Sequence, residues 1–102
     1  TLDPNSSTER KFVDYLYQNN LRLPDDSQQL VDDIYCRPDF IYDGHIYVFC
    51  DGLPHDQPAQ IAKDRTQRQA LIDAGYEVIV YYYKNNLSSL VRERPDVFRS
   101  VK

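Results

Sequence analysis

Two aspartates stand where a tight turn would bring neighbouring strands together. Asp39 precedes a short apolar segment, and Asp51 ends a longer one. Asp43-Gly44 lies between them and predicts a hairpin, because glycine readily adopts positive φ. Counted outward from this turn, Asp39 should lie opposite Val48 or Phe49. Two carboxylates from adjacent strands can hold Mg²⁺ through oxygen ligands; the alternative is a turn cap and a plain strand end.

A histidine and a basic helix could supply the remaining chemistry. His55 lies in the loop after the second aspartate, and an imidazole can transfer protons near neutral pH. The sequence alone favours a surface-loop histidine instead. Lys63, Arg65 and Arg68 lie in a predicted helix at residues 59–74. They form either a salt-bridged solvent face or a basic edge that meets a phosphate backbone.

Hydrophobic periodicity and turn signals predict the order helix, three strands, helix, strand, helix. A three-strand meander followed by a crossover helix and a last strand gives an α/β fold, with a mixed four-stranded sheet flanked by helices. The third strand is apolar almost throughout, which indicates that both its faces are covered. The predicted elements are a helix at 8–19 capped by Ser6, strands at 30–35, 37–42 and 46–51, a helix at 59–74, a strand at 76–83, and a short helix from Asn85 or Asn86 to Val91.

The charge of the chain is unevenly distributed. Its 102 residues, one small domain by length, carry a net charge of −4 and a pI near 5.0, which argues against a dedicated nucleic-acid binder. Residues 1–56 carry a net −7 and residues 57–102 a net +3. Residues 57–102 could face phosphates, but their excess of positive charge is small. We therefore expect the chain to depend on a larger protein to hold DNA.

Several protein classes are excluded by composition. No apolar run approaches the roughly 20 residues that span a bilayer, so no membrane partner is expected. Two cysteines suit a reducing compartment and lack zinc-ligand spacing, and no secretion signal is visible, so a cytoplasmic location is expected.

The absence of an initial Met predicts a processed chain or an excised module. The run Tyr81-Tyr82-Tyr83 predicts packing, with base stacking as the alternative.

An ordered set of short motifs adds a family resemblance. These are Pro38-Asp39-Phe40, then Val48 to Gly52 with His55, then Lys63-Asp64 and Arg68, and finally Leu71, Gly75 and Val78-Ile79. In this order they resemble the PD-(D/E)XK nuclease superfamily, and in particular its very-short-patch-repair endonuclease-like branch. The resemblance covers roughly residues 8–91 and implies a restriction-endonuclease-like αβββαβ core.

The resemblance also implies which residues would hold a metal. Asp39 matches the metal-binding aspartate of the superfamily. The second acidic position falls on Phe49, a departure that this branch shares, and there a backbone carbonyl, here that of Cys50, helps to hold the metal. Asp51 falls at the lysine position of the motif, where many small relatives carry an acid. The implied cofactor is Mg²⁺ or Mn²⁺, and the implied reaction is hydrolysis of phosphodiester bonds in DNA.

Further roles follow from the same resemblance. His55 matches a loop histidine near the scissile phosphate, and Glu9 matches a helix glutamate that often completes such sites. Lys63 could replace the missing lysine from the helix. Similar domains occur at the C-terminal end of large helicase-like bacterial proteins, which implies a helicase-like domain in the same chain.

Two other functions remain open. The phenylalanine at position 49 and the acidic pI favour a nuclease-like module that binds DNA, or positions a partner domain, without cutting. The third possibility is a small α/β interaction domain without a site, because fold alone does not fix function.

Overall fold

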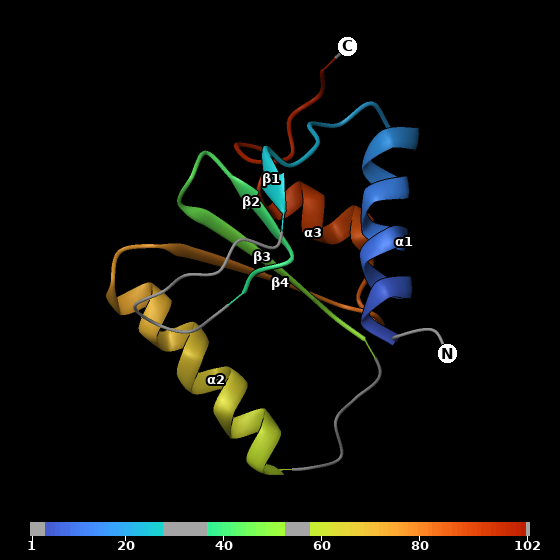
Figure 1. Ribbon diagram of the computed structural model, residues 1–102. Helices are drawn as coiled ribbons and strands as arrows, with labels where there is room; N and C mark the ends of the chain where they lie inside the picture. Colours follow the sequence, from blue (N-terminus) through green and yellow to red (C-terminus); the bar gives the residue numbers. More distant parts are fainter. Residues whose placement is uncertain (1–3, 28–36, 53–57, 102) are drawn as a thin grey trace. The chain divides into compact units, whose positions relative to one another are not determined.

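The computed structural model describes residues 4–27, 37–52 and 58–101 (Figure 1). Over these ranges the chain forms an α/β fold with a four-stranded mixed sheet and three helices, which confirms the predicted fold class. The elements are α1 (Pro4–Gln18), β1 (Asp26–Ser27), β2 (Phe40–Tyr42), β3 (Ile46–Asp51), α2 (Pro58–Asp73), β4 (Glu77–Tyr82) and α3 (Leu87–Glu93).

The sheet has the strand order β1-β2-β3-β4, and β1, β2 and β3 are antiparallel neighbours. Two backbone hydrogen bonds define how β4 joins β3. The N–H of Glu77 donates to the carbonyl of His45, and the N–H of Tyr83 donates to the carbonyl of Asp51, both at 2.9 Å. Residue numbers rise together along both strands, so β4 runs parallel to β3. The sheet is therefore mixed, as predicted.

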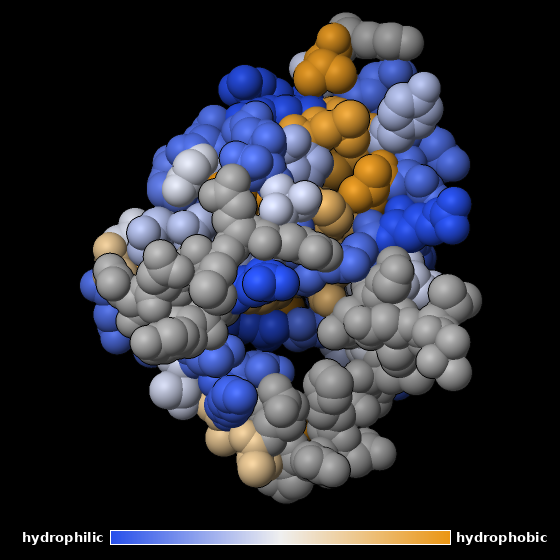
Figure 2. Space-filling model, in the orientation of Figure 1, coloured by the Kyte–Doolittle hydropathy of each residue, from blue (hydrophilic) through white to orange (hydrophobic). Residues whose placement is uncertain are grey.

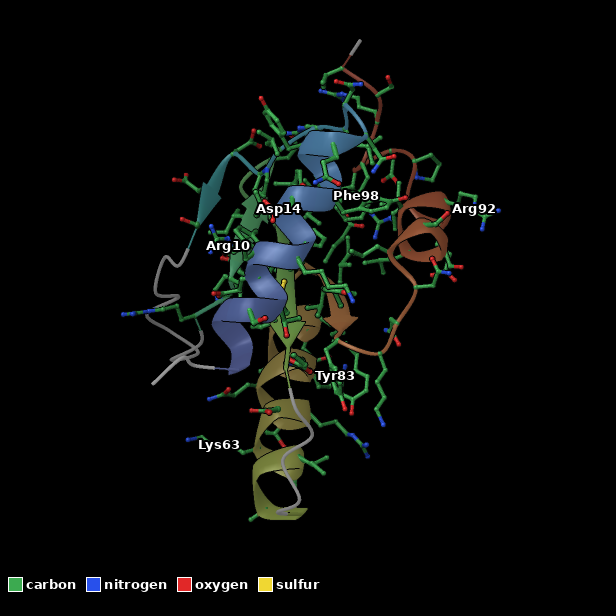
Figure 3. All side chains as sticks on the ribbon, turned by 90° about the vertical axis from the view of Figure 1, so that its right-hand side faces the viewer. Arg10, Asp14, Lys63, Tyr83, Arg92 and Phe98 are labelled. Atoms are coloured by element: carbon green, nitrogen blue, oxygen red, sulfur yellow. The ribbon has the colours of Figure 1, made fainter. Side chains whose placement is uncertain are left out.

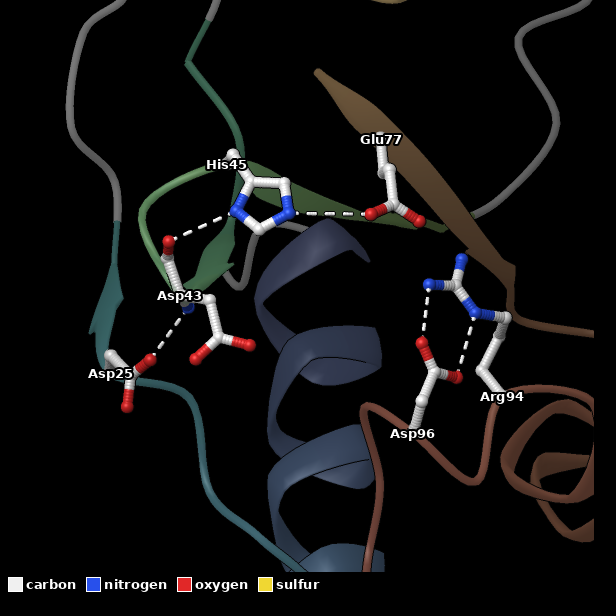
Figure 4. Close-up of polar contacts among 6 residues, drawn as sticks. All are labelled: Asp25, Asp43, His45, Glu77, Arg94 and Asp96. Carbon is white, nitrogen blue, oxygen red and sulfur yellow. Dashed lines mark hydrogen bonds and ion pairs between the residues drawn. The ribbon is translucent and has the colours of Figure 1, made fainter. Parts of the chain in front are cut away.

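The β2–β3 hairpin turns at the two residues that the sequence indicates. Asp43 and Gly44 have φ values of 55° and 75°, and residues 43–45 form the loop between the paired residues Tyr42 and Ile46. His45 closes the turn by donating its N–H to the carbonyl of Tyr42 at 3.2 Å. The Asp25 carboxylate accepts a hydrogen bond of 2.7 Å from the N–H of Asp43 (Figure 4), which ties the turn to the segment before β1.

The chain divides into two compact units, and it passes from one to the other within β3 and again within β4. We call residues 1–24, 50–53 and 80–102 the helical unit, because it contains α1 and α3. Residues 25–49 and 54–79, with β1, β2 and α2, are called the hairpin unit.

The core of the hairpin unit joins α2 to one side of the hairpin. Its buried cluster consists of Ile41, Tyr47, Phe49 and Leu71. The ring of Tyr76 stacks on Tyr47 with centroids 4.6 Å apart. Ile46 and Val48 alternate with these residues along β3 and are also buried. Both faces of β3 are thus covered, which confirms the prediction made from its apolar sequence.

The core of the helical unit is aromatic. Phe12 of α1 is fully buried, and its ring centroid lies 5.9 Å from those of Tyr81 in β4 and Phe98 after α3. The contact with Phe98 is edge-to-face, a favourable arrangement for two aromatic rings. Val97 is also fully buried. The segment after α3 therefore contributes directly to the core.

The helix boundaries confirm some of the predicted signals. Asn86 caps α3, because its side-chain oxygen accepts hydrogen bonds from the N–H groups of Ser88 and Ser89 at 2.8 and 3.3 Å. Gly75 follows α2 with a φ of 99°, the left-handed conformation that commonly ends a helix.

Other boundaries differ from the predictions. The helix α1 begins at Pro4, so Ser6 lies within it and the predicted Ser6 cap is wrong. Proline suits a first helical position, because it has no N–H to satisfy and its φ is already helical. The strand predicted at 30–35 lies outside the described residues, and the first described strand is Asp26–Ser27.

An ion pair closes the turn that follows α3. Arg94 donates two hydrogen bonds to the carboxylate of Asp96, at 3.1 and 3.0 Å (Figure 4). These bonds lower the pKa of Asp96 below its usual value. The pKa of Asp96 is lower in the folded chain than in the unfolded one. The ion pair therefore contributes to the stability of the fold at neutral pH. It is lost as the pH falls through the folded-state pKa.

The hydroxyl of Tyr81 predicts a stabilising substitution. It is buried and has no hydrogen-bond partner among the described residues, an arrangement that costs about 1–3 kcal/mol. We expect Tyr81→Phe to keep the ring contact with Phe12 and to raise the free energy of unfolding by about 1 kcal/mol. Thermal unfolding should show a rise in Tm of about 4–8 °C.

The matched control is Tyr42→Phe. Tyr42 is an equally buried tyrosine, in the hairpin unit, that does have an interaction partner. This substitution should give no gain in Tm. A lower Tm for Tyr81→Phe would show that its hydroxyl is satisfied in solution.

Candidate active site

Asp39 is fixed by its backbone at the start of the hairpin. Its N–H donates to the carbonyl of Val48 at 2.9 Å, and Phe40, the next residue, lies opposite Val48 in the strand register. This confirms the predicted position of Asp39 beside Val48 and Phe49. The side chain is half-buried, and Pro38 before it is buried. Asp39 thus occupies a well-defined position in the hairpin unit.

Asp51 and Cys50 end strand β3 in the helical unit. Asp51 is half-buried, and its carbonyl accepts the hydrogen bond from Tyr83 of the β4 side. Backbone carbonyls alternate between the two edges of a strand. The carbonyl of Cys50 therefore faces the same edge of β3 as that of Val48, the edge on which β2 pairs. Cys50 as a whole is only 1% exposed.

The donors named by the resemblance fit magnesium by their chemistry. Asp39 and Asp51 offer carboxylate oxygens and Cys50 a carbonyl oxygen, which are the hard ligands that Mg²⁺ and Mn²⁺ prefer. In residues 4–27, 37–52 and 58–101, no three His, Cys, Asp or Glu side chains are grouped as a metal site. Mg²⁺ commonly takes only one or two carboxylates and completes its shell with water and substrate phosphates. Two carboxylates therefore match what this ion needs from protein side chains.

Phe49, the residue on which the resemblance would place a second acid, is part of the core. It is 7% exposed and packs in the cluster with Leu71 of α2. The guanidinium carbon of Arg68 lies 4.8 Å from its ring centroid, within the range of a cation–π contact. Phe49 thus contacts the guanidinium of Arg68 through its ring. A carboxylate at position 49 would instead bind Arg68 as an ion pair.

The three basic residues of α2 do not share one side of the helix. Lys63 and Arg65 are exposed, and Arg68 is half-buried against β3. At about 100° per residue, Lys63 is roughly 140° from Arg68 around the axis, whereas Arg65 and Arg68 are about 60° apart. Lys63 projects away from the helix in Figure 3. Arg65 and Arg68 are therefore the pair that could contact one phosphate backbone.

Two further predicted site residues are His55 and Glu9. His55 lies outside the described residues, and Glu9 is half-buried in α1 of the helical unit. Neither of two hollows on this unit contains a predicted site residue. One, of about 470 Å³, is lined by Ser7, Arg10, Lys11, Asp14, Tyr15, Gln18 and Leu87. The other, of about 700 Å³, is lined by Tyr17, Gln18, Asn20, Leu21, Leu23 and Val101. Figure 2 shows apolar surface near the C-terminus of the chain.

Charge is also distributed unevenly between the two units. The helical unit has eight Lys or Arg and six Asp or Glu, a net +2, and the hairpin unit has four and ten, a net −6. Nucleic acid is attracted by positive charge. The helical unit, which contains Asp51, is therefore the more favourable of the two for a phosphate backbone.

Comparisons of the chain with protein-family models, with curated proteins and with solved structures found no match. No helix in the described part of the chain is long and apolar enough to cross a membrane.

Proposed function

We propose that this chain is a metal-dependent DNA endonuclease-like domain that hydrolyses phosphodiester bonds. It works in the cytoplasm as a module of a larger, helicase-like DNA-processing protein. The main support is the hairpin register, since the backbone of Asp39 is bonded to the strand that ends in Asp51. The αβββαβ order of elements agrees with the order that the PD-(D/E)XK resemblance implies.

Each candidate residue has a role in this proposal. The carboxylates of Asp39 and Asp51 and the carbonyl of Cys50 hold the metal ion. Bound Mg²⁺ supplies polarisation of the phosphate and a lower pKa for a water molecule. His55 or Lys63 orients the attacking water or gives a proton to the leaving oxygen. Glu9 provides a further acidic group from α1.

The proposal predicts metal-dependent cleavage. The protein is incubated with supercoiled plasmid and with single-stranded DNA, in Mg²⁺, in Mn²⁺ and in EDTA. We expect cleavage in either metal, no cleavage in EDTA, and loss of cleavage in Asp39→Ala, because the metal then loses a ligand. Equal cleavage by the wild type and by Asp39→Ala would identify a contaminating nuclease and refute the proposal.

A second candidate function is a nuclease-like module that binds DNA or positions a partner domain without cutting. The observation that favours it is Phe49, which fills the place of an acid with a buried ring under Arg68. In this case the wild type binds DNA in a mobility-shift assay but cuts it in neither metal. Arg65→Ala and Arg68→Ala would then weaken the binding.

A further inference from the structure

We propose that Tyr83 and Lys84 bind one nucleotide of a single strand beside Asp51, with the base stacked on the Tyr83 ring and the phosphate held by Lys84. This inference rests on the proposed nuclease function, because it locates substrate next to a residue assigned to the metal. Neither Tyr83 nor Lys84 belongs to the motifs that carry the family resemblance.

The backbone brings Tyr83 to the end of β3. Its N–H donates to the carbonyl of Asp51 at 2.9 Å, so its backbone is bonded to the last residue of β3. Figure 3 shows Tyr83 where β4 ends. A group bound on its side chain would therefore lie at the same end of the two parallel strands as Asp51.

The ring of Tyr83 is held in place by its neighbours. The ring of Tyr82 meets it at 64° with centroids 4.9 Å apart, a T-shaped contact that restricts its rotation. Both side chains are half-buried, whereas Tyr81 is fully buried in the core. Within the three-tyrosine run, Tyr81 therefore packs in the core, and Tyr83 combines partial exposure with a backbone bond to Asp51.

Lys84 adds the positive charge that a phosphate requires. It is exposed, and its Nζ lies 5.7 Å from the Tyr83 ring centroid, within reach of a cation–π contact. An aromatic ring beside a flexible cation is the combination with which proteins bind single strands. A base must leave its pair before its face can stack on a side chain, so this arrangement favours a single strand over a duplex. The net +2 of the helical unit acts in the same direction.

Fluorescence anisotropy in EDTA tests this inference without cleavage. The probes are labelled oligo-dT, oligo-rU and a DNA duplex of equal length. We expect the wild type to bind oligo-dT more tightly than the duplex. Tyr83→Leu, which keeps apolar bulk but has no ring, should weaken single-strand binding about tenfold, and Tyr83→Phe should bind like the wild type. Thermal melting confirms that both variants are folded.

Lys84 is tested by salt dependence. Lys84→Ala should weaken binding and reduce the slope of log affinity against log salt by about 0.7, because one phosphate contact is lost. Lys84→Arg should restore both. Dependence on Tyr83 with either oligo-dT or oligo-rU supports the nucleotide site and identifies the sugar. Independence with both oligomers, or duplex binding as tight as single-strand binding, overturns it.

The two proposals can fail separately. If Tyr83-dependent binding is found but the chain never cuts in Mg²⁺ or Mn²⁺, the nucleotide site stands and the nuclease function falls. If cleavage is lost in Asp39→Ala while Tyr83→Leu binds single strands like the wild type, the nuclease function stands and this inference falls.

Discussion

Asp39→Asn is expected to lower metal-dependent cleavage by about 100-fold or more, while the chain stays folded. The substitution keeps the size and shape of the side chain but removes the negative charge that attracts Mg²⁺. A catalytic metal contributes several kcal/mol to transition-state stabilisation, and each 1.4 kcal/mol is tenfold in rate. The hydrogen bond from Asp39 to Val48 uses the backbone, so it survives the substitution. Initial rates of plasmid relaxation in Mg²⁺ measure the effect.

Asp43→Asn is the matched control for this experiment. It removes a carboxylate from the same hairpin, at the turn, where asparagine tolerates the positive φ of 55°. Cleavage by Asp43→Asn should therefore equal that of the wild type. An equal loss in both variants would mean that overall charge, and not a metal ligand at Asp39, determines the rate.

Phe12→Ala is expected to give the largest loss of stability, about 3–5 kcal/mol. Phe12 is fully buried between the rings of Tyr81 and Phe98, and its removal leaves a cavity that these rings cannot fill without moving. Small domains have only about 5–15 kcal/mol of stability in total. Denaturant unfolding should therefore show the loss in free energy of unfolding. Thermal unfolding should show a fall in Tm of more than about 12 °C.

Tyr17→Ala on the same helix provides the comparison. Its side chain is 73% exposed, so its loss should change stability by no more than about 0.5 kcal/mol. A loss for Phe12→Ala as small as for Tyr17→Ala would contradict the aromatic core of the helical unit.

Strand β3 and helix α2 could be predicted because strong local signals bound them. The turn at Asp43-Gly44 precedes β3, and Pro58 and Gly75 stand at the two ends of α2. Strand β2 begins at Phe40 and not at residue 37. Pro38 has no N–H to donate, so regular pairing starts only after it.

The sequence defines the position of Asp39 better than it defines which residues lie around Asp51. The hairpin places Asp39 beside Val48 and Phe49, because the position and length of the turn set the register. No turn connects β3 to β4, so the sequence contains no comparable signal for the parallel register that brings Tyr83 to Asp51. The segregation of charge into two units likewise depends on contacts between distant segments.

Mn²⁺ binding tests the central claim, that Asp39 and Asp51 hold one catalytic metal ion. Electron paramagnetic resonance measures free Mn²⁺ during titration of the wild type, Asp39→Asn, Asp51→Asn and the double variant. Substitutions of two residues that bind the same metal ion do not have additive effects on its affinity. We predict that each single substitution weakens binding at least about tenfold and that the double variant binds little more weakly than either. Binding by the double variant as tight as by the wild type would contradict the shared metal site.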